Sequence, residues 1–254
     1  MGRPPPLPEL VRYCHPDKIL SATRLPGTLT EDAIAALYGT DAATYRSLRA
    51  DLAAAAASPP VAGSPFAPAS TILALGDSIT DDLGSWAEIL RHALPEVTII
   101  NAGLSGDTTT GAIARLSRLD VGRPTWALVL LGTNDARCHG GASMLVSHAE
   151  TRRNLRILDG ALRRRCRHVR WLTPPPIFAP VDADPDLHWE PADLAAKAQL
   201  VRALDPGAID LWPGFTADHL CADGLHPSPA GQRFIAERLL AEEVSHELVE
   251  LDEP

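Results

Sequence analysis

From residue 71 onward, short apolar runs alternate with segments whose apolar residues recur at helical spacing. The apolar runs predict five strands, at 71–76, 97–103, 126–132, 169–174 and 208–213. Runs that are apolar at nearly every position are typical of parallel strands covered on both faces. The intervening segments predict five helices, at 85–94, 108–119, 147–166, 191–204 and 228–244. This alternation predicts an α/β fold with three layers, α/β/α, around a mostly parallel five-stranded sheet.

The chain before residue 71 has a different character. Residues 1–57 predict a small helical N-terminal extension, with helices near 9–13, 30–38 and 40–57. Residues 58–70 are rich in proline, alanine and serine, which indicates a linker. We therefore expect one main domain over 71–247, followed by an acidic tail at 248–254.

Composition narrows the classes of partner. The 254 residues are 45% hydrophobic and 22% charged, as expected of a globular domain. A net charge of −9 disfavours nucleic acid, since phosphate binding needs clustered positive charge. One local basic stretch, Arg163–Arg165 with Arg167, ends a predicted helix, where the helix dipole favours cations. We interpret this basic stretch as a solvated helix face. The alternative is that it docks an anionic carrier.

The cysteines and the N-terminus bear on the compartment. The four cysteines lie far apart without a C-x-x-C pair or zinc spacing; they are Cys14, Cys138, Cys166 and Cys221. We read them as ordinary reduced thiols. The sequence begins without the apolar segment of a secretory signal, and no apolar run reaches the roughly 20 residues of a membrane span. These features predict a cytoplasmic protein with no membrane span.

Four short polar stretches stand where the predicted strands end or just before the last helix. They read GDSIT at 76–80, NAGLSGDT at 101–108, GTND at 132–135 and DGLHP at 223–227. In doubly wound sheets the functional groups gather at the carboxyl ends of the strands. We therefore expect these four stretches to meet at one edge of the sheet.

Three residues from these stretches form a candidate catalytic set. A serine hydroxyl barely ionises near neutrality and needs a base, which His226 can supply to Ser78. Asp223, three positions before His226, can orient the imidazole. Taken singly, Ser78 could be only a helix N-cap and Asp223 only an Asx-turn residue, without a catalytic role. Asp77 is expected to brace the turn.

The ordered quartet of a serine in GDS, a glycine, an asparagine in GxND and a late DxxH resembles the SGNH (GDSL-type) hydrolase superfamily. The resemblance covers about residues 71–245 and implies a flavodoxin-like sheet. It also implies an oxyanion hole made by the backbone N–H groups of Ser78 and Gly106 and the side-chain amide of Asn134. The SGDT stretch most resembles the bacterial thioesterase/lysophospholipase branch.

This resemblance implies a serine hydrolase that cleaves carboxylic esters, or thioesters, of small molecules through an acyl-serine. Short loops around the site favour short-chain or acetyl esters, and neither a metal nor a cofactor is required. Three alternatives stay open: an acyltransferase using the same acyl-enzyme, a thioesterase or lysophospholipase acting on longer chains, and a non-catalytic binding module. Oligomeric state is open as well.

One further segment belongs with the predicted site. Residues 173–191 read as a loop that follows the fourth strand and should overhang the catalytic edge. We expect its aromatic residues Phe178 and Trp189 to help shape the acyl or leaving-group pocket, with a plain surface loop as the alternative.

Overall fold

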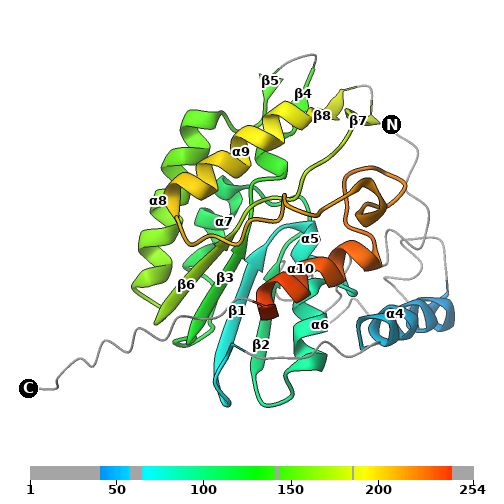
Figure 1. The fold of residues 1–254 in the computed structure, drawn as a ribbon, viewed down its shortest axis with the longest axis vertical. Coiled ribbons are helices and arrows are strands. Elements are labelled where there is room, and N and C mark those ends of the chain that lie inside the picture. Colours follow the sequence, from blue (N-terminus) through cyan, green and yellow to red (C-terminus); the bar gives the residue numbers. More distant parts are fainter. Residues whose placement is uncertain (1–40, 58–64, 141–142, 185, 242–254) are drawn as a thin grey trace, which may run out of the picture.

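The computed structural model describes residues 41–57, 65–140, 143–184 and 186–241. Its centre is a parallel sheet in the order β2-β1-β3-β6 (Figure 1). The strands are β1 (Thr71–Gly76), β2 (Thr98–Gly103), β3 (Trp126–Leu130) and β6 (His168–Leu172). All three neighbouring pairs are parallel and in continuous register. The α/β class and the parallel sheet predicted from the sequence are therefore confirmed.

The predicted fifth strand is present only in rudimentary form. A single parallel bridge joins Leu172 to Ile209, with the Ile209 N–H donating to Trp171 O at 2.8 Å. Just beyond this bridge, the Leu211 N–H donates to Thr173 Oγ1 at 2.9 Å instead of to a backbone carbonyl. Residues 208–213 thus extend the sheet edge beside β6 without forming a regular strand, and the regular sheet of the described chain has four strands.

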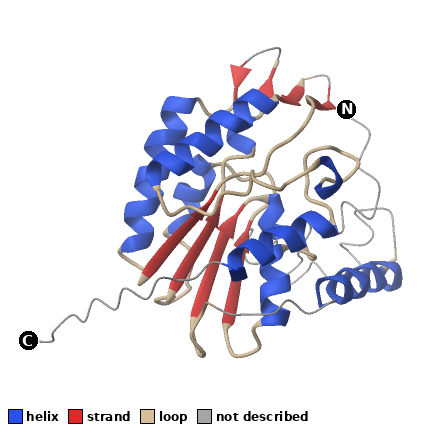
Figure 2. Ribbon diagram, in the orientation of Figure 1, coloured by secondary structure: helices blue, strands red, loops and turns tan. Residues whose placement is uncertain are grey.

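Helices cover both faces of the sheet (Figure 2). On one face lie α6 (Trp86–Ala93) and α10 (Pro229–Ala241), and on the other α7 (Thr109–Leu116), α8 (His148–Arg163) and α9 (Pro191–Leu204). Side chains alternate between the layers, so Ile72 faces α6 and α10 while Leu73 faces α7 and α8. Each apolar run therefore contributes to two cores, which explains why apolar residues predominate in β1 and β3.

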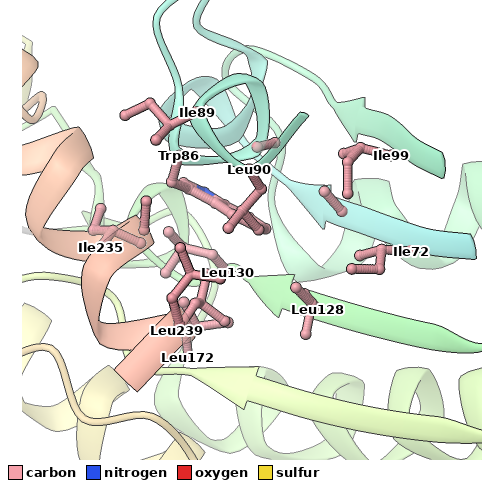
Figure 3. Close-up of a cluster of buried hydrophobic side chains, with 14 of the residues drawn as sticks. Ile72, Trp86, Ile89, Leu90, Ile99, Leu128, Leu130, Leu172, Ile235 and Leu239 are labelled. Carbon is pink, nitrogen blue, oxygen red and sulfur yellow. The ribbon is translucent and has the colours of Figure 1, made fainter. Parts of the chain in front are cut away.

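Trp86 is central to one of these cores (Figure 3). Its ring is fully buried among strand and helix side chains that include Leu130 and Ile235. The indole N–H donates to Thr80 Oγ1 at 3.2 Å, and the backbone N–H of Trp86 donates to Gln232 Oε1 at 3.0 Å. Trp86 of α6 is thus hydrogen-bonded both to the short helix α5 (Ser78–Asp81), through Thr80, and to α10, through Gln232.

A second, smaller sheet was not expected. It is antiparallel, in the order β5-β4-β8-β7, and its strands are β4 (Cys138–His139), β5 (Ser143–Met144), β7 (Val181–Asp184) and β8 (Leu187–Trp189). The prediction that 173–191 is all loop was therefore wrong. Strands of two to four residues are too short for an alternating pattern to reveal them.

The described part of the N-terminal extension is one helix, α4 (Ala42–Ala57), which lies against α6. Asp41 accepts hydrogen bonds from the backbone N–H and the hydroxyl of Thr44, both at 2.9 Å, and so caps this helix. The helices expected before residue 41, much of the linker and the acidic tail lie outside the described residues.

Two further properties concern the described residues as a whole. The described part of the chain has no helix with both the length and the apolar character that a membrane crossing requires. Among the described residues, Cys138, Cys166 and Cys221 form no disulfide, and their reduced state stays a prediction.

Candidate active site

Ser78 stands where the central strand ends. β1 stops at Gly76, and the short helix α5 (Ser78–Asp81) begins two residues later. The Asp77 carboxylate accepts a hydrogen bond from the Ile79 N–H at 3.0 Å, which caps the helix as expected of a bracing residue. A Cβ at Gly76 would clash with Thr80 and with the backbone of β3, so glycine allows this tight turn. The turn sets Ser78 at the carboxyl edge of the sheet.

His226 and Asp223 reach Ser78 from the loop before α10. Ser78 Oγ lies 3.0 Å from His226 Nε2, although 148 residues separate them. His226 Nδ1 lies 2.6 Å from Asp223 Oδ2. Asp223 Oδ1 accepts the backbone N–H groups of Leu225 and His226, at 2.9 and 3.0 Å. The three residues predicted as a catalytic set therefore form one continuous chain of hydrogen bonds.

The loop that carries His226 is held in shape by its own backbone. The Cys221 N–H donates to His226 O at 2.7 Å, and Gly224 adopts φ +71°, a conformation that favours glycine. Partial burial tends to raise the pKa of Asp223, but the hydrogen bond and charge of His226 and the two N–H donors outweigh it, so that pKa is lowered overall. Asp223 therefore stays ionised beside the imidazole near neutral pH.

Gly106 lies on the loop after β2, close to α5. It adopts φ +78°, and a Cβ there would meet open space. The neighbouring Ser105 is anchored through its N–H and its hydroxyl to Asp81 Oδ2, at 3.0 and 2.8 Å. The Gly106 N–H has no acceptor among the described residues. The contacts of Ser105 therefore fix the loop, while the Gly106 N–H stays available to donate to a ligand.

Asn134 begins a short 3-10 helix, η1 (Asn134–Ala136), directly after β3. Its side chain is buried, and one amide hydrogen donates to Asp107 O at 3.1 Å. That bond joins the loop of Asn134 to the loop of Gly106. The structure thus brings the three predicted stretches after β1, β2 and β3 together at one edge, as the parallel topology requires.

A buried ion pair that sequence reasoning missed supports these loops. Arg115 on α7 donates through Nε to Asp107 Oδ2 at 2.7 Å and through Nη2 to Gly76 O at 3.1 Å. Burial raises the pKa of Asp107, and the guanidinium of Arg115 opposes that rise. In the sequence Arg115 resembles any charged residue on a helix; its only distinguishing signal is its place on a helix of mostly small and apolar residues.

The electrostatic setting of Asp77 is unusual. The residue is fully buried, and its Oδ2 accepts no hydrogen bond from the described residues. Burial raises the pKa of Asp77 to about 7, against the lowering effects of the Ile79 N–H and of His226. A carboxyl group next to Ser78 in the chain can therefore be protonated near neutral pH.

The aromatic residues of 173–191 lie differently from what we expected. Trp189 is only 5% exposed; it packs with Ala136 and Leu225, and its indole donates to Thr133 O at 3.1 Å. It therefore braces the loops that carry Asn134 and His226, and a direct part of Trp189 in shaping the pocket stays a prediction. Phe178 is 51% exposed, and its part in substrate selection stays a prediction.

The arginine-rich stretch lies away from Ser78, because it precedes β6 and so stands at the amino end of the sheet. Arg163 pairs with Asp159 at 2.8 Å, and Arg165 donates to Leu116 O and Leu119 O. Arg164 and Arg167 line a hollow of about 390 Å³ nearby. Docking of an anionic carrier here stays a prediction.

The three-layer fold and the linked serine, histidine and aspartate are typical of serine hydrolases. A family model, GDSL-like Lipase/Acylhydrolase, matches residues 74–234. The arylesterase of Vibrio mimicus is 30% identical over 192 residues, or 69% of this chain and 88% of that protein. Esterase TesA of Pseudomonas aeruginosa is 30% identical over 187 residues, or 68% and 87%. The chain belongs to the GDSL-like lipase/acylhydrolase family.

Solved structures agree on the fold. A lipase/acylhydrolase from Enterococcus faecalis superimposes with a TM-score of 0.56 at 24% identity, covering 67% of this chain and 93% of that one. Axe2, an acetylxylan esterase from Geobacillus stearothermophilus, gives a TM-score of 0.55 at 21% identity, covering 69% and 94%. The resemblance to SGNH hydrolases is therefore confirmed in both sequence and fold.

Proposed function

We propose that the protein hydrolyses carboxylic esters through a covalent acyl intermediate on Ser78. The observation that supports this most strongly is the chain of hydrogen bonds from Asp223 through His226 to Ser78, at 2.6 and 3.0 Å. Family membership supports ester hydrolysis in general, and the geometry supplies a specific route for it.

In this route the Ser78 oxygen attacks the ester carbonyl carbon while His226 Nε2 accepts the hydroxyl proton. The tetrahedral intermediate then collapses: the bond to the alcohol oxygen breaks, and His226 returns the proton to that oxygen. Water repeats the sequence on acyl-Ser78 and releases the acid. Asp223 remains ionised throughout and stabilises the imidazolium through Nδ1.

Three donors are proposed for the negative charge that develops on the carbonyl oxygen. They are the N–H groups of Ser78 and Gly106 and the amide of Asn134. Neither backbone N–H has an acceptor among the described residues, and the Asn134 amide uses only one of its hydrogens on Asp107 O. One such donor is worth about 100- to 1,000-fold in rate.

We propose small carboxylic esters, with short-chain or acetyl groups, as the substrates. Similarity to an arylesterase over most of both chains supports this class. The thioesterase 1/protease 1/lysophospholipase L1 of Escherichia coli is 38% identical over 76 residues, which is 27% of this chain. That shorter match makes thioesters and longer acyl chains the alternative.

The test is hydrolysis of p-nitrophenyl esters from acetate to palmitate, with acyl-coenzyme A thioesters as a parallel series. Wild type should prefer the short esters, and Ser78→Ala should lose at least about 1,000-fold in kcat on every substrate. Equal rates for the two proteins would refute the mechanism. A preference for long chains or thioesters would refute the substrate class, and product analysis with added alcohols separates hydrolysis from acyl transfer.

A further inference from the structure

A buried lysine lies behind the loop that carries Asn134. Lys197 on α9 is completely buried, and Nζ donates to Val146 O at 2.7 Å and to Thr151 Oγ1 at 2.9 Å. Burial lowers the pKa of Lys197 to about 8, although Asp135 and Asp193 oppose the change. At neutral pH the side chain is therefore still a charged donor. A buried ammonium is rare unless it is paired, so its partners matter.

Thr151 connects this lysine to Asp135. Because its oxygen accepts from Lys197, its proton is directed to Asp135 Oδ2, 2.7 Å away. Asp135 is fully buried and also receives the hydroxyl of Thr109 at 2.6 Å and the Thr109 N–H at 2.8 Å. Asn154 donates to the Thr109 hydroxyl at 3.0 Å, which fixes that proton as well. The hydroxyls of Thr151 and Thr109 therefore both donate to Asp135.

The network ends at the residue beside Asn134. Asp135 follows Asn134 in η1, and its carboxylate is clamped between α7 and α8 through Thr109 and Thr151. On the other side, Trp189 donates to Thr133 O. The turn that carries the Asn134 amide is thus held from two directions. Through Thr151, the network links the buried Asp135 to the positive charge of Lys197.

We propose that Lys197 and Thr151 are positioning residues, which hold Asp135 and thereby aim the amide of Asn134 at the carbonyl oxygen of the substrate. The proposal rests on the oxyanion role given to Asn134 above. Displacing a catalytic group by about 1 Å can cost about 100-fold in rate, so loss of this support should appear in kcat rather than in KM.

The experiment compares Thr151→Val, which keeps the shape and removes the hydroxyl, with Thr151→Ser, which keeps the hydroxyl. Thr151→Val should lower kcat on p-nitrophenyl acetate about 10- to 100-fold with KM changed less than about twofold. Thr151→Ser should return kcat to within about threefold of wild type, since the donor and acceptor remain. Leu239→Ala, in the core under α10, is the control for reduced stability and should lower the melting temperature without changing kcat.

A double-mutant cycle with Asn134→Ala separates the possible outcomes. If Thr151 acts through Asn134, Thr151→Val costs little further activity in the Asn134→Ala background. Fully additive losses, or a Thr151→Val enzyme that is less stable with normal kcat, would overturn the proposal. An Asn134→Ala enzyme with full activity would instead refute the oxyanion assignment, and this inference with it. Thr151→Ala enters the same cycle if Thr151→Val does not fold.

Discussion

The buried carboxyl of Asp77 is the residue whose environment differs most from what its place in a polar turn predicts. Folding raises its pKa from 3.8 to about 7. The folded protein therefore binds a proton, between about pH 4 and pH 7, that the unfolded chain releases. Asp77 favours the folded state most at about pH 4 and below, and that contribution is lost as pH rises to about 7.

We predict that Asp77→Asn removes this dependence. Asparagine keeps an oxygen for the Ile79 N–H but does not ionise. At about 1.4 kcal/mol per pKa unit, the wild-type free energy of unfolding should fall by roughly 3 kcal/mol more than that of the variant between pH 4 and pH 7. Urea unfolding at each pH measures this difference. Parallel curves for the two proteins would show that Asp77 has an ordinary pKa.

At the residue scale, the sequence allowed a prediction of the groups that react but not of those that hold them. The order of motifs singled out Ser78, Asp223 and His226, and the structure brings all three into contact. Arg115 and Lys197 were missed, because the sequence does not show that a helix turns one charged side chain inward. Only the packing of the helices on the sheet decides which face is buried.

At the scale of elements, helix α7 and the loop before it act as one unit. Arg115 on α7 bridges Asp107, whose side chain is 4% exposed, and the carbonyl of Gly76. The loop that carries Gly106 is therefore attached to the end of β1, where the turn to Ser78 begins. The ion pair in this unit is largely shielded from solvent, because the side chains of Arg115 and Asp107 are 18% and 4% exposed.

We predict that Arg115→Met destabilises this unit, because it leaves a buried carboxylate without its partner. Loss of one member of a buried ion pair costs about 3 kcal/mol in the free energy of unfolding, and kcat/KM should fall about 10-fold or more as the Gly106 N–H moves. Arg118→Met is the matched control, since Arg118 is exposed on the following turn. Denaturant unfolding measures the stability and ester hydrolysis measures kcat/KM. If Arg115→Met matches wild type in the two measurements, as Arg118→Met should, the contacts of Arg115 have no role.

The elements themselves were largely predictable. The five predicted helices of the main domain appear with bounds shifted by a few residues, and 191–204 matches α9 at both ends. Prediction failed for the four short strands of the second sheet. It also failed for residues 208–213, which were expected to form a regular strand and make only a single bridge. Two to four residues carry too little periodic signal, and pairing at a sheet edge depends on side-chain hydrogen bonds such as the one that the Leu211 N–H donates to Thr173 Oγ1.

At the scale of the whole molecule, strand order creates the site. The chain places β2 on one side of β1 and then β3 on the other, so Gly106 and Asn134 come to flank Ser78 from opposite directions. Hydrophobic patterns predict parallel strands but not their order, which the sequence specified only through the resemblance that implies a flavodoxin-like sheet. His226 then arrives from the far end of the domain, which makes the site a product of the complete fold.

The most direct test of the account is labelling by an activated fluorophosphonate, followed by intact-mass and peptide mass spectrometry. The account predicts one adduct per chain, located on Ser78. It also predicts no adduct on Ser78→Ala and strongly slowed labelling of a folded His226→Ala variant. Labelling of another residue, or unchanged labelling of either variant, would contradict the claim that Ser78 is a nucleophile activated by His226.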